Sequence, residues 1–201
     1  MALSAIAVNC TLKKSPAASS CEKLLNQVAE ALRAQGVRCD LVRAVDLTIS
    51  PGVTSDEGAG DQWPDLRRRI LAADILILGT PIWLGHPSSV CQRILERMDA
   101  FLGELDDAGR MVTYGRVAGV AVVGNEDGAH HVSAELFQAL NDVGFTLPAS
   151  AVTYWVGEAM QKKNFDELPA TPQKTAQATR ELALNCTHLA SLLQASPYPP
   201  R

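Results

Sequence analysis

The feature that most constrains the fold of this chain is a regular alternation of short apolar segments with amphipathic helical patterns. Strands are expected at 3–8, 37–43, 75–78, 116–123 and 151–155, and helices at 20–35, 64–72, 89–102, 130–143 and 171–194. Strands separated by helices need crossover connections, which build a parallel sheet covered by helices on both faces. The pattern therefore predicts an α/β fold of the smaller, five-stranded doubly wound kind.

Composition fits one globular domain and excludes several function classes. The 201 residues are 47% hydrophobic and 20% charged, which predicts a single domain over 1–201 with a flexible tail at 196–201. The net charge of −4 and the lack of a dense basic cluster argue against nucleic-acid binding. No apolar segment approaches the roughly 20 residues of a membrane span, and no leader-like segment follows Met1.

The cysteines indicate free thiols rather than a metal centre or disulfides. The chain has five, an odd number, and no C-x-x-C pair: Cys10, Cys21, Cys39, Cys91 and Cys186. This spacing favours neither a zinc site nor an iron–sulfur cluster. Buried thiols in a reducing compartment are the expectation, so the protein is expected in the cytoplasm.

The first of three loops expected at the carboxyl edge of the sheet spans 9–20. It carries hydroxyls, two lysines and the start of a helix, whose free N–H groups and dipole favour an anion. It lacks the G-x-x-x-x-G-K-[ST] and G-x-G-x-x-G patterns, so a phosphate monoester fits it better than a nucleotide triphosphate or dinucleotide. An ordinary serine-capped helix is the alternative.

The second loop, 80–89, follows an apolar run that is expected to stop at Gly79. It combines two prolines, Trp83 and Gly85 before Ser88 and Ser89, which are candidate N-caps of the next helix. An aromatic surface with free backbone N–H groups suits a flat heteroaromatic ligand. The alternative is a turn in which Trp83 merely covers the sheet edge.

The third loop, 124–131, offers two glycines and several titratable side chains. Gly124 and Gly128 allow close backbone approach to a ligand. The acids and histidines that follow match no familiar metal-ligand spacing, and Asp127 is expected to cap the next helix. With no nucleophile–base pair in view, we expect no metal site, no catalytic side chain, and chemistry supplied by a cofactor.

Together the three loops resemble those of the flavodoxin-like NAD(P)H-dependent FMN reductases and their quinone-reductase relatives. The resemblance covers most of residues 3–155 and is most specific at 79–85 with Ser88, which is similar to the family's G-T-P-x-[YW]-x-G segment. It implies a flavodoxin-like five-stranded sheet, FMN as cofactor, NAD(P)H as hydride donor, and a homodimer or homotetramer.

The resemblance also implies a set of cofactor-binding residues. The phosphate would be held by Thr11, Lys13, Ser19, Ser20 and Cys21, the ring by Pro81, Ile82, Trp83, Leu84 and Gly85, and the polar edge of the ring by Gly124, Asn125, Glu126, Asp127 and Gly128. Cys21 departs from the threonine often found in the family. A thiol is a poorer donor than a hydroxyl, which leaves the backbone N–H of Cys21 as the usable group.

The expected function is an oxidoreductase that accepts hydride from NAD(P)H. The electrons would pass to a quinone, free flavin or another small-molecule acceptor. One rival is a flavodoxin-type electron carrier without its own NAD(P)H activity, although such carriers tend to be more acidic than this chain. Another is a flavin-free domain that keeps the fold as an interaction module.

Overall fold

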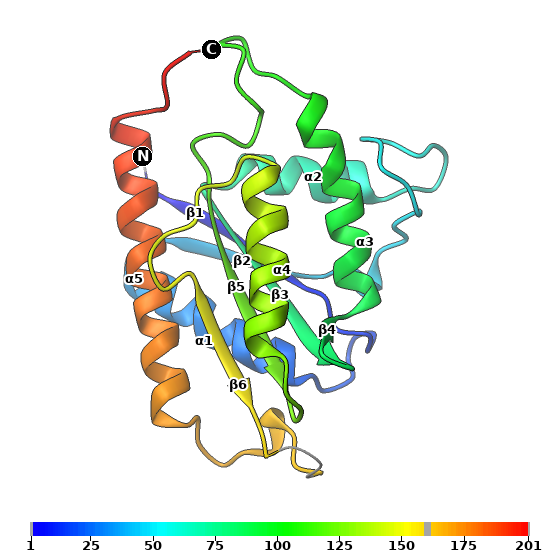
Figure 1. The fold of residues 1–201 in the computed structure, drawn as a ribbon, viewed down its shortest axis with the longest axis vertical. Coiled ribbons are helices and arrows are strands. Elements are labelled where there is room, and N and C mark those ends of the chain that lie inside the picture. The colour runs from blue at the N-terminus through cyan, green and yellow to red at the C-terminus, as the bar shows by residue number, and fades with distance from the viewer. Residues whose placement is uncertain (1, 159–161, 201) are drawn as a thin grey trace.

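The computed structural model describes residues 2–158 and 162–200, and its centre is one sheet. The strands are β1 Ser4–Asn9, β2 Arg38–Arg43, β3 Ile75–Trp83, β4 His86–Pro87, β5 Val117–Gly124 and β6 Val152–Val156. Five of them run parallel in the order β2-β1-β3-β5-β6, while β4 pairs only with β3, antiparallel (Figure 1). This order is the flavodoxin-like doubly wound arrangement that the sequence predicted.

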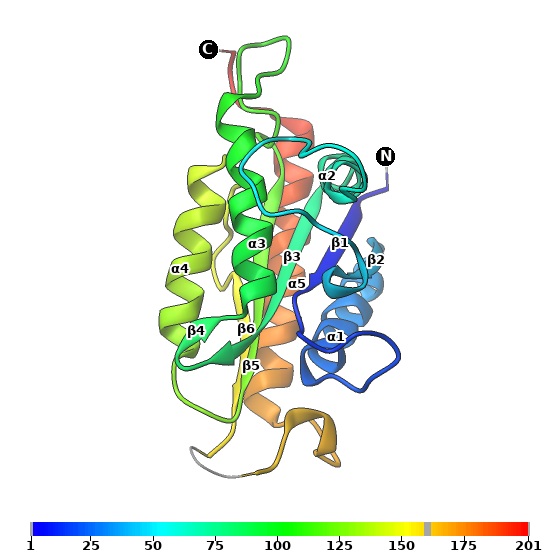
Figure 2. The ribbon, with the colours of Figure 1, turned by 90° about the vertical axis from the view of Figure 1, so that its right-hand side faces the viewer.

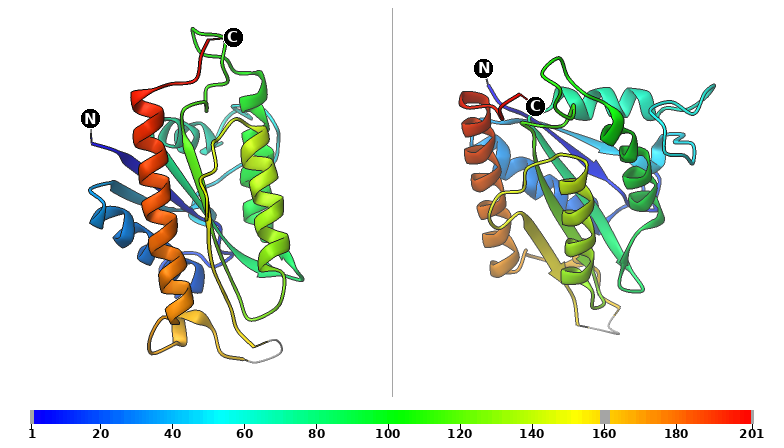
Figure 3. Two further views of the ribbon diagram at one scale, coloured as in Figure 1. Left: turned by 60° about the vertical axis from the view of Figure 1, so that its left-hand side comes forward. Right: turned by 45° about the horizontal axis from the view of Figure 1, so that its top comes forward.

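Helices cover both faces of the sheet. They are α1 Ser20–Ala34, α2 Trp63–Ala72, α3 Ser89–Met98, α4 Ala129–Asp142 and α5 Gln173–Ala195. The first and last pack on one face, where α5 runs along the sheet, and the other three pack on the opposite face (Figures 2 and 3). Each face buries its own apolar cluster, as expected for a doubly wound sheet.

Local sequence signals explain where α1 begins and ends. Leu24, Val28 and Leu32 recur at helical spacing and are fully buried. The Ser19 side chain accepts the N–H of Glu22 as an N-cap. Gly36 follows the helix with a φ of +79°, a conformation that only glycine adopts at little cost. The helix bounds predicted from these signals are confirmed to within a residue.

The expected end of the third strand at Gly79 is wrong. β3 continues to Trp83 because β5 runs beside it, with Thr80 opposite Val122 and Pro81 opposite Val123. Gly79 instead allows α1 to pack closely, since a Cβ there would lie 2.5 Å from Leu25 Cδ1. What the sequence presented as a loop is therefore a strand extension, a tight turn and the short strand β4.

Three helix termini also differ from expectation. The helix expected over 89–102 is α-helical only to Met98 and continues as a 3-10 turn, Asp99–Gly103. Asp127 does not cap α4, whose N-cap is Gly128 without a side-chain bond. The last helix begins at Gln173, because the Thr171 hydroxyl accepts a hydrogen bond from Gln27 of α1 instead of capping. At α4 a neighbouring glycine outweighs the local signal, and at α5 a tertiary contact does so.

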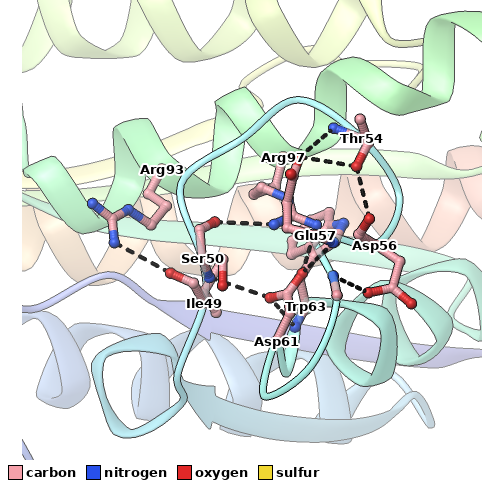
Figure 4. A network of polar contacts seen from close by, with 10 residues as sticks. Ile49, Ser50, Thr54, Asp56, Glu57, Asp61, Trp63, Arg93 and Arg97 are labelled. Atoms are coloured by element: carbon pink, nitrogen blue, oxygen red, sulfur yellow. Dashed lines mark hydrogen bonds and ion pairs between the residues drawn. The ribbon is translucent and has the colours of Figure 1, made fainter.

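The long loop predicted over 48–61 is held by a buried ion pair. Asp61 and Arg97 of α3 both have fully buried side chains, and Arg97 Nη2 lies 2.8 Å from Asp61 Oδ2 (Figure 4). Asp61 also accepts the backbone N–H groups of Ser50, Glu57 and Trp63. Burial acts to raise the pKa of Asp61, but these hydrogen bonds and Arg97 outweigh it and lower the pKa below its ordinary value.

The remaining sequence expectations concern the thiols, the tail and membranes. All five cysteines are free and buried, as predicted. In the tail, the Tyr198 carbonyl accepts a hydrogen bond from Arg110, and its ring packs on Tyr114 near the 106–112 turn. Within 2–158 and 162–200, no helix combines the length and apolar character needed to cross a bilayer.

Candidate functional site

A pocket opens at the carboxyl ends of β1, β3, β5 and β6, and most of the predicted cofactor-binding residues line it. They are Thr11, Lys13, Ser19, Ser20, Cys21, Pro81, Ile82, Trp83, Gly124, Asn125 and Glu126. The pocket thus collects residues from all three loops singled out in the sequence. Its position is the one that parallel α/β sheets generally use for ligands.

Four predicted residues do not line this pocket: Leu84, Gly85, Asp127 and Gly128. Leu84 has 89% of its surface exposed and a φ of +51° at the β3–β4 turn. Gly85 and Gly128 contact each other, because a Cβ on Gly128 would lie 2.9 Å from Gly85 Cα. The second and third loops are therefore packed together beside the pocket, and these glycines serve that contact.

Arg43, at the end of β2, fixes the loop between β1 and α1. Its Nη1 donates to the carbonyls of Lys13, at 3.1 Å, and Ala17, at 2.9 Å. Its Nη2 pairs with Glu22 Oε2 at 2.5 Å, and the side chain is almost fully buried. Sequence reasoning missed Arg43, since an arginine at a strand end carries no local signal. The loop that offers Lys13 to the pocket is thus held from its inner side.

The start of α1 presents several hydrogen-bond donors to the pocket. As the first two residues of the helix, Ser20 and Cys21 have N–H groups with no intrahelical acceptor. The Ser19 and Thr11 hydroxyl oxygens accept the N–H groups of Glu22 and Lys13, so their own protons remain available for donation. This end of the pocket, with the Lys13 ammonium, favours an anion.

Two predicted phosphate contacts need refinement. The Ser20 hydroxyl donates to Asp166 Oδ1 at 2.6 Å, so Ser20 offers the pocket its N–H and not its hydroxyl. Cys21 is 2% exposed and packs in the core on the α1 and α5 face. Burial raises the pKa of this thiol well above its ordinary value, so it stays neutral. At Cys21, too, the backbone is the useful donor.

β6 and the segment after it supply pocket residues that were not among the predicted cofactor-binding residues. Trp155, Asn164 and Phe165 line the pocket, and the Trp155 and Phe165 rings lie 5.5 Å apart. Lys23 of α1 holds this segment by donating to the carbonyl of Phe165 at 3.0 Å. The available signal was the long loop after the last strand, because such loops are often functional.

The third loop contributes a glycine and two polar side chains. Gly124 contacts Ile82 of β3, since a Cβ at Gly124 would lie 2.9 Å from the Ile82 Cβ. Asn125 Nδ2 donates to Asn164 Oδ1 at 3.4 Å. One carboxylate oxygen of Glu126, Oε1, is buried without a hydrogen-bond partner. A buried oxygen left unpaired is costly, so Glu126 Oε1 is a natural acceptor for a ligand N–H.

The two ends of the pocket therefore have different chemistry. One end combines helix N–H groups, two hydroxyls and a lysine, whereas the other has indole and phenyl rings next to backbone and carboxylate acceptors. A flat ring that carries both a phosphate and polar edges complements such a pocket. FMN has these features, so the residues present fit the cofactor that the resemblance implied.

Comparison with known proteins gives a family match over most of the chain. The model of the family described as NADPH-dependent FMN reductase matches residues 4–161. A protein of Streptomyces davaonensis named 8-demethyl-8-aminoriboflavin-5'-phosphate synthase is 34% identical over 209 residues, covering 98% of this chain and 81% of the relative.

Two further similarities cover nearly all of this chain. The crystal structure of RosB with bound 8-demethyl-8-formylriboflavin-5'-phosphate superposes with a TM-score of 0.90 at 32% identity, covering 98% of this chain and 82% of RosB. A Mycobacterium bovis protein named divalent metal cation transporter MntH is 38% identical over 200 residues. The match covers 96% of this chain, which spans only 29% of that relative's length.

Proposed function

The chain belongs to the NADPH-dependent FMN reductase family, and from this premise we propose that it accepts hydride from NAD(P)H and passes electrons to a small acceptor. It is an FMN-dependent oxidoreductase of this family, with FMN and NAD(P)H as cofactors. A quinone or free flavin is the proposed acceptor class. The observation that carries the proposal is a pocket in which donors suited to a phosphate face aromatic walls.

At the anion end, the chain's work is to bind and orient. The N–H groups of Ser20 and Cys21 and the Ser19 hydroxyl would hold the phosphate at the positive end of the α1 dipole. Lys13 would add a cation, and Arg43 keeps its loop in place. Each of these groups is already in position, so little ordering is needed on binding.

At the ring end, the chain's work is to exclude water and to offer hydrogen bonds. When bound, FMN supplies the hydride-accepting ring. Trp83 and Trp155 would wall that ring, while Asn125 and Glu126 would take its polar edge. Such preorganised polar groups favour charge that develops during a reaction. No acid or base side chain is required of the protein.

The proposal is tested by adding NADPH anaerobically to the FMN-loaded protein and following the visible absorption of oxidised flavin. Loss of the oxidised-flavin absorption within seconds of adding NADPH supports an enzyme with its own NAD(P)H activity. A parallel titration with NADH measures the coenzyme preference. Free FMN with NADPH is the control. A protein that binds FMN tightly but leaves it oxidised is instead an electron carrier of the flavodoxin type.

A second candidate function is that this chain changes the flavin itself. The S. davaonensis relative is named as a synthase of an aminoriboflavin phosphate, and RosB was solved with a formyl flavin phosphate. In this chain, the unpaired Glu126 Oε1 in the pocket favours contact with a polar N–H group. Mass spectrometry of flavin recovered after turnover separates the two functions, because a cofactor returns with its mass unchanged.

We further propose a homo-oligomer in the cytoplasm. At the pocket, Trp83 is 54% exposed and the neighbouring Leu84 is 89% exposed, and a second copy covering them would remove apolar surface from water. Five free thiols favour a reducing compartment. Light scattering coupled to gel filtration, on the wild type and on Leu84→Glu, tests the oligomer: the variant is expected to dissociate.

A further inference from the structure

A histidine–carboxylate cluster lies beside the pocket, where β4 meets α4. His86 comes from β4, whereas His131 and Glu135 lie one helical turn apart on α4. Figure 2 shows β4 next to the end of α4 at which His131 lies. This cluster was not predicted from the sequence, because His86 is 45 residues from His131 and 49 residues from Glu135.

The three side chains converge on one point. Glu135 Oε1 lies 3.1 Å from His86 Nδ1 and 2.8 Å from His131 Nε2. The two imidazole rings meet edge to face, with centroids 5.0 Å apart. One ligand atom from each residue falls within 4.8 Å of the others. The geometry points to a binding site for one divalent transition-metal ion of the zinc class, held by His86, His131 and Glu135.

The spacing of the ligand atoms suits such an ion after a small expansion. Zinc binds imidazole nitrogen and carboxylate oxygen at about 2.0–2.2 Å, which puts tetrahedral ligand atoms roughly 3.3–3.5 Å apart. The two observed separations, 2.8 and 3.1 Å, fall a few tenths of an ångström below that range. Two imidazoles and one carboxylate leave a fourth position open for water.

Charge and exposure support an ion that enters from solvent. His86 and His131 are 61% and 56% exposed, and Glu135 is 29% exposed, so an ion can reach all three side chains. The second carboxylate oxygen, Glu135 Oε2, is buried without a hydrogen-bond partner. Glu135 therefore has one oxygen, Oε1, in contact with both imidazoles and a second whose charge no hydrogen bond offsets, and a cation bound at this carboxylate would offset that charge.

Binding would tie the β3–β4 turn to α4. His86 follows directly after Trp83, Leu84 and Gly85 in the chain, so a bridge from His86 to α4 restrains the turn that adjoins the flavin pocket. The ion site does not use any residue of the proposed phosphate or ring contacts. It therefore stands or fails independently of the proposed FMN chemistry.

The test is equilibrium dialysis of the full chain, without a histidine tag, against Zn²⁺, with metal content measured afterwards. We expect saturation near one ion per chain. His86→Ala, His131→Ala and Glu135→Gln are each expected to weaken binding at least tenfold, and Zn²⁺ is expected to raise the Tm of the wild type but not of these three variants. Co²⁺ provides a second readout, because its visible spectrum reports coordination by nitrogen and oxygen ligands.

Two histidines outside the cluster provide matched controls. His130 lies next to His131, but its Nε2 lies 3.3 Å from the Tyr154 hydroxyl, and His188 lies exposed on α5. His130→Ala and His188→Ala are expected to bind Zn²⁺ as the wild type does. The absence of saturable binding, unchanged binding in His86→Ala, or loss of binding in His188→Ala would each overturn the proposal.

Discussion

The long loop over 47–62 and the pocket at the sheet edge place buried carboxylates in opposite situations. In the loop, the Asp61 side chain is fully buried and surrounded by donors, which are three backbone N–H groups and Arg97. In the pocket, Glu126 has one buried oxygen with no donor. Both carboxylate oxygens of Asp61 have donors within the protein, whereas Oε1 of Glu126 has none. A buried carboxylate whose oxygens are all paired indicates a structural role, and one with an unpaired oxygen indicates a place for a ligand donor.

The largest expected effect comes from breaking the loop's ion pair. Asp61→Ala leaves Arg97 buried without its carboxylate, and we expect a loss of about 3–5 kcal/mol in the free energy of unfolding. Urea denaturation measures it. Asp65→Ala is the matched control, because the Asp65–Arg68 pair is more than 70% exposed and is worth less than about 1 kcal/mol. Equal losses of unfolding free energy in both variants would contradict the structural role assigned to the buried Asp61–Arg97 pair.

The next effect tests the anion end of the pocket. Ser19→Asp keeps a good N-cap for α1, so the fold should persist, but it adds a negative charge where the phosphate is proposed to bind. We expect FMN affinity to fall at least tenfold, about 1.4 kcal/mol, by fluorescence titration. Ser89→Asp adds the same charge to the first turn of α3, outside the pocket lining. Unchanged affinity in Ser19→Asp would exclude this end as the phosphate site.

A smaller effect appears in the pH dependence of stability. The pKa of Asp61 is lowered in the folded protein, because burial raises it by less than the hydrogen bonds and Arg97 lower it. A lowered pKa means that the carboxylate stabilises the fold above its unfolded pKa of about 3.9, and that this contribution is lost as pH falls through the folded value. The stability gap between wild type and Asp61→Asn should therefore narrow as pH falls below about 4 in urea titrations. A difference in stability that stays constant with pH would contradict the lowered pKa of Asp61.

The smallest expected change in the free energy of unfolding comes from a substitution in the pocket. Glu126→Gln preserves size and removes charge from an oxygen that has no partner, so we expect the free energy of unfolding to change by less than about 0.5 kcal/mol. The same isosteric exchange at Asp61 should cost clearly more. If Glu126→Gln proves as destabilising as Asp61→Asn, the contrast between a structural and a ligand-binding carboxylate fails.

Much of the fold was predictable because its signals are local. The strand–helix alternation, the Ser19 and Ser88 caps and the glycine after α1 each depend on a few neighbouring residues. Part of the site was also predictable. The ends of parallel strands bring three separate loops to one edge of the sheet, and Thr11, Trp83 and Asn125 from these loops line one pocket. Local spacing and sheet geometry are sufficient for such statements.

The features that were predicted wrongly or missed depend on contacts between residues that are distant in the sequence. The extent of β3 was set by β5 beside it, and the role of Gly79 by Leu25 of α1. Phe165 lines the pocket beside Trp155 of β6 because Lys23 of α1 holds the segment after β6. No window of sequence contains both partners of these contacts.

The sequence by itself determined the order of elements, the sheet class and the three loops that face a ligand, since hydrophobic periodicity and capping are properties of short segments. Only the tertiary structure decided which groups in those loops are free. Hydrogen bonding across the chain occupied the Ser20 hydroxyl with Asp166, left Glu126 Oε1 without a partner, and brought His86 to Glu135. Availability for binding depends on what neighbours in space have already bound, and that is fixed only when the chain is folded.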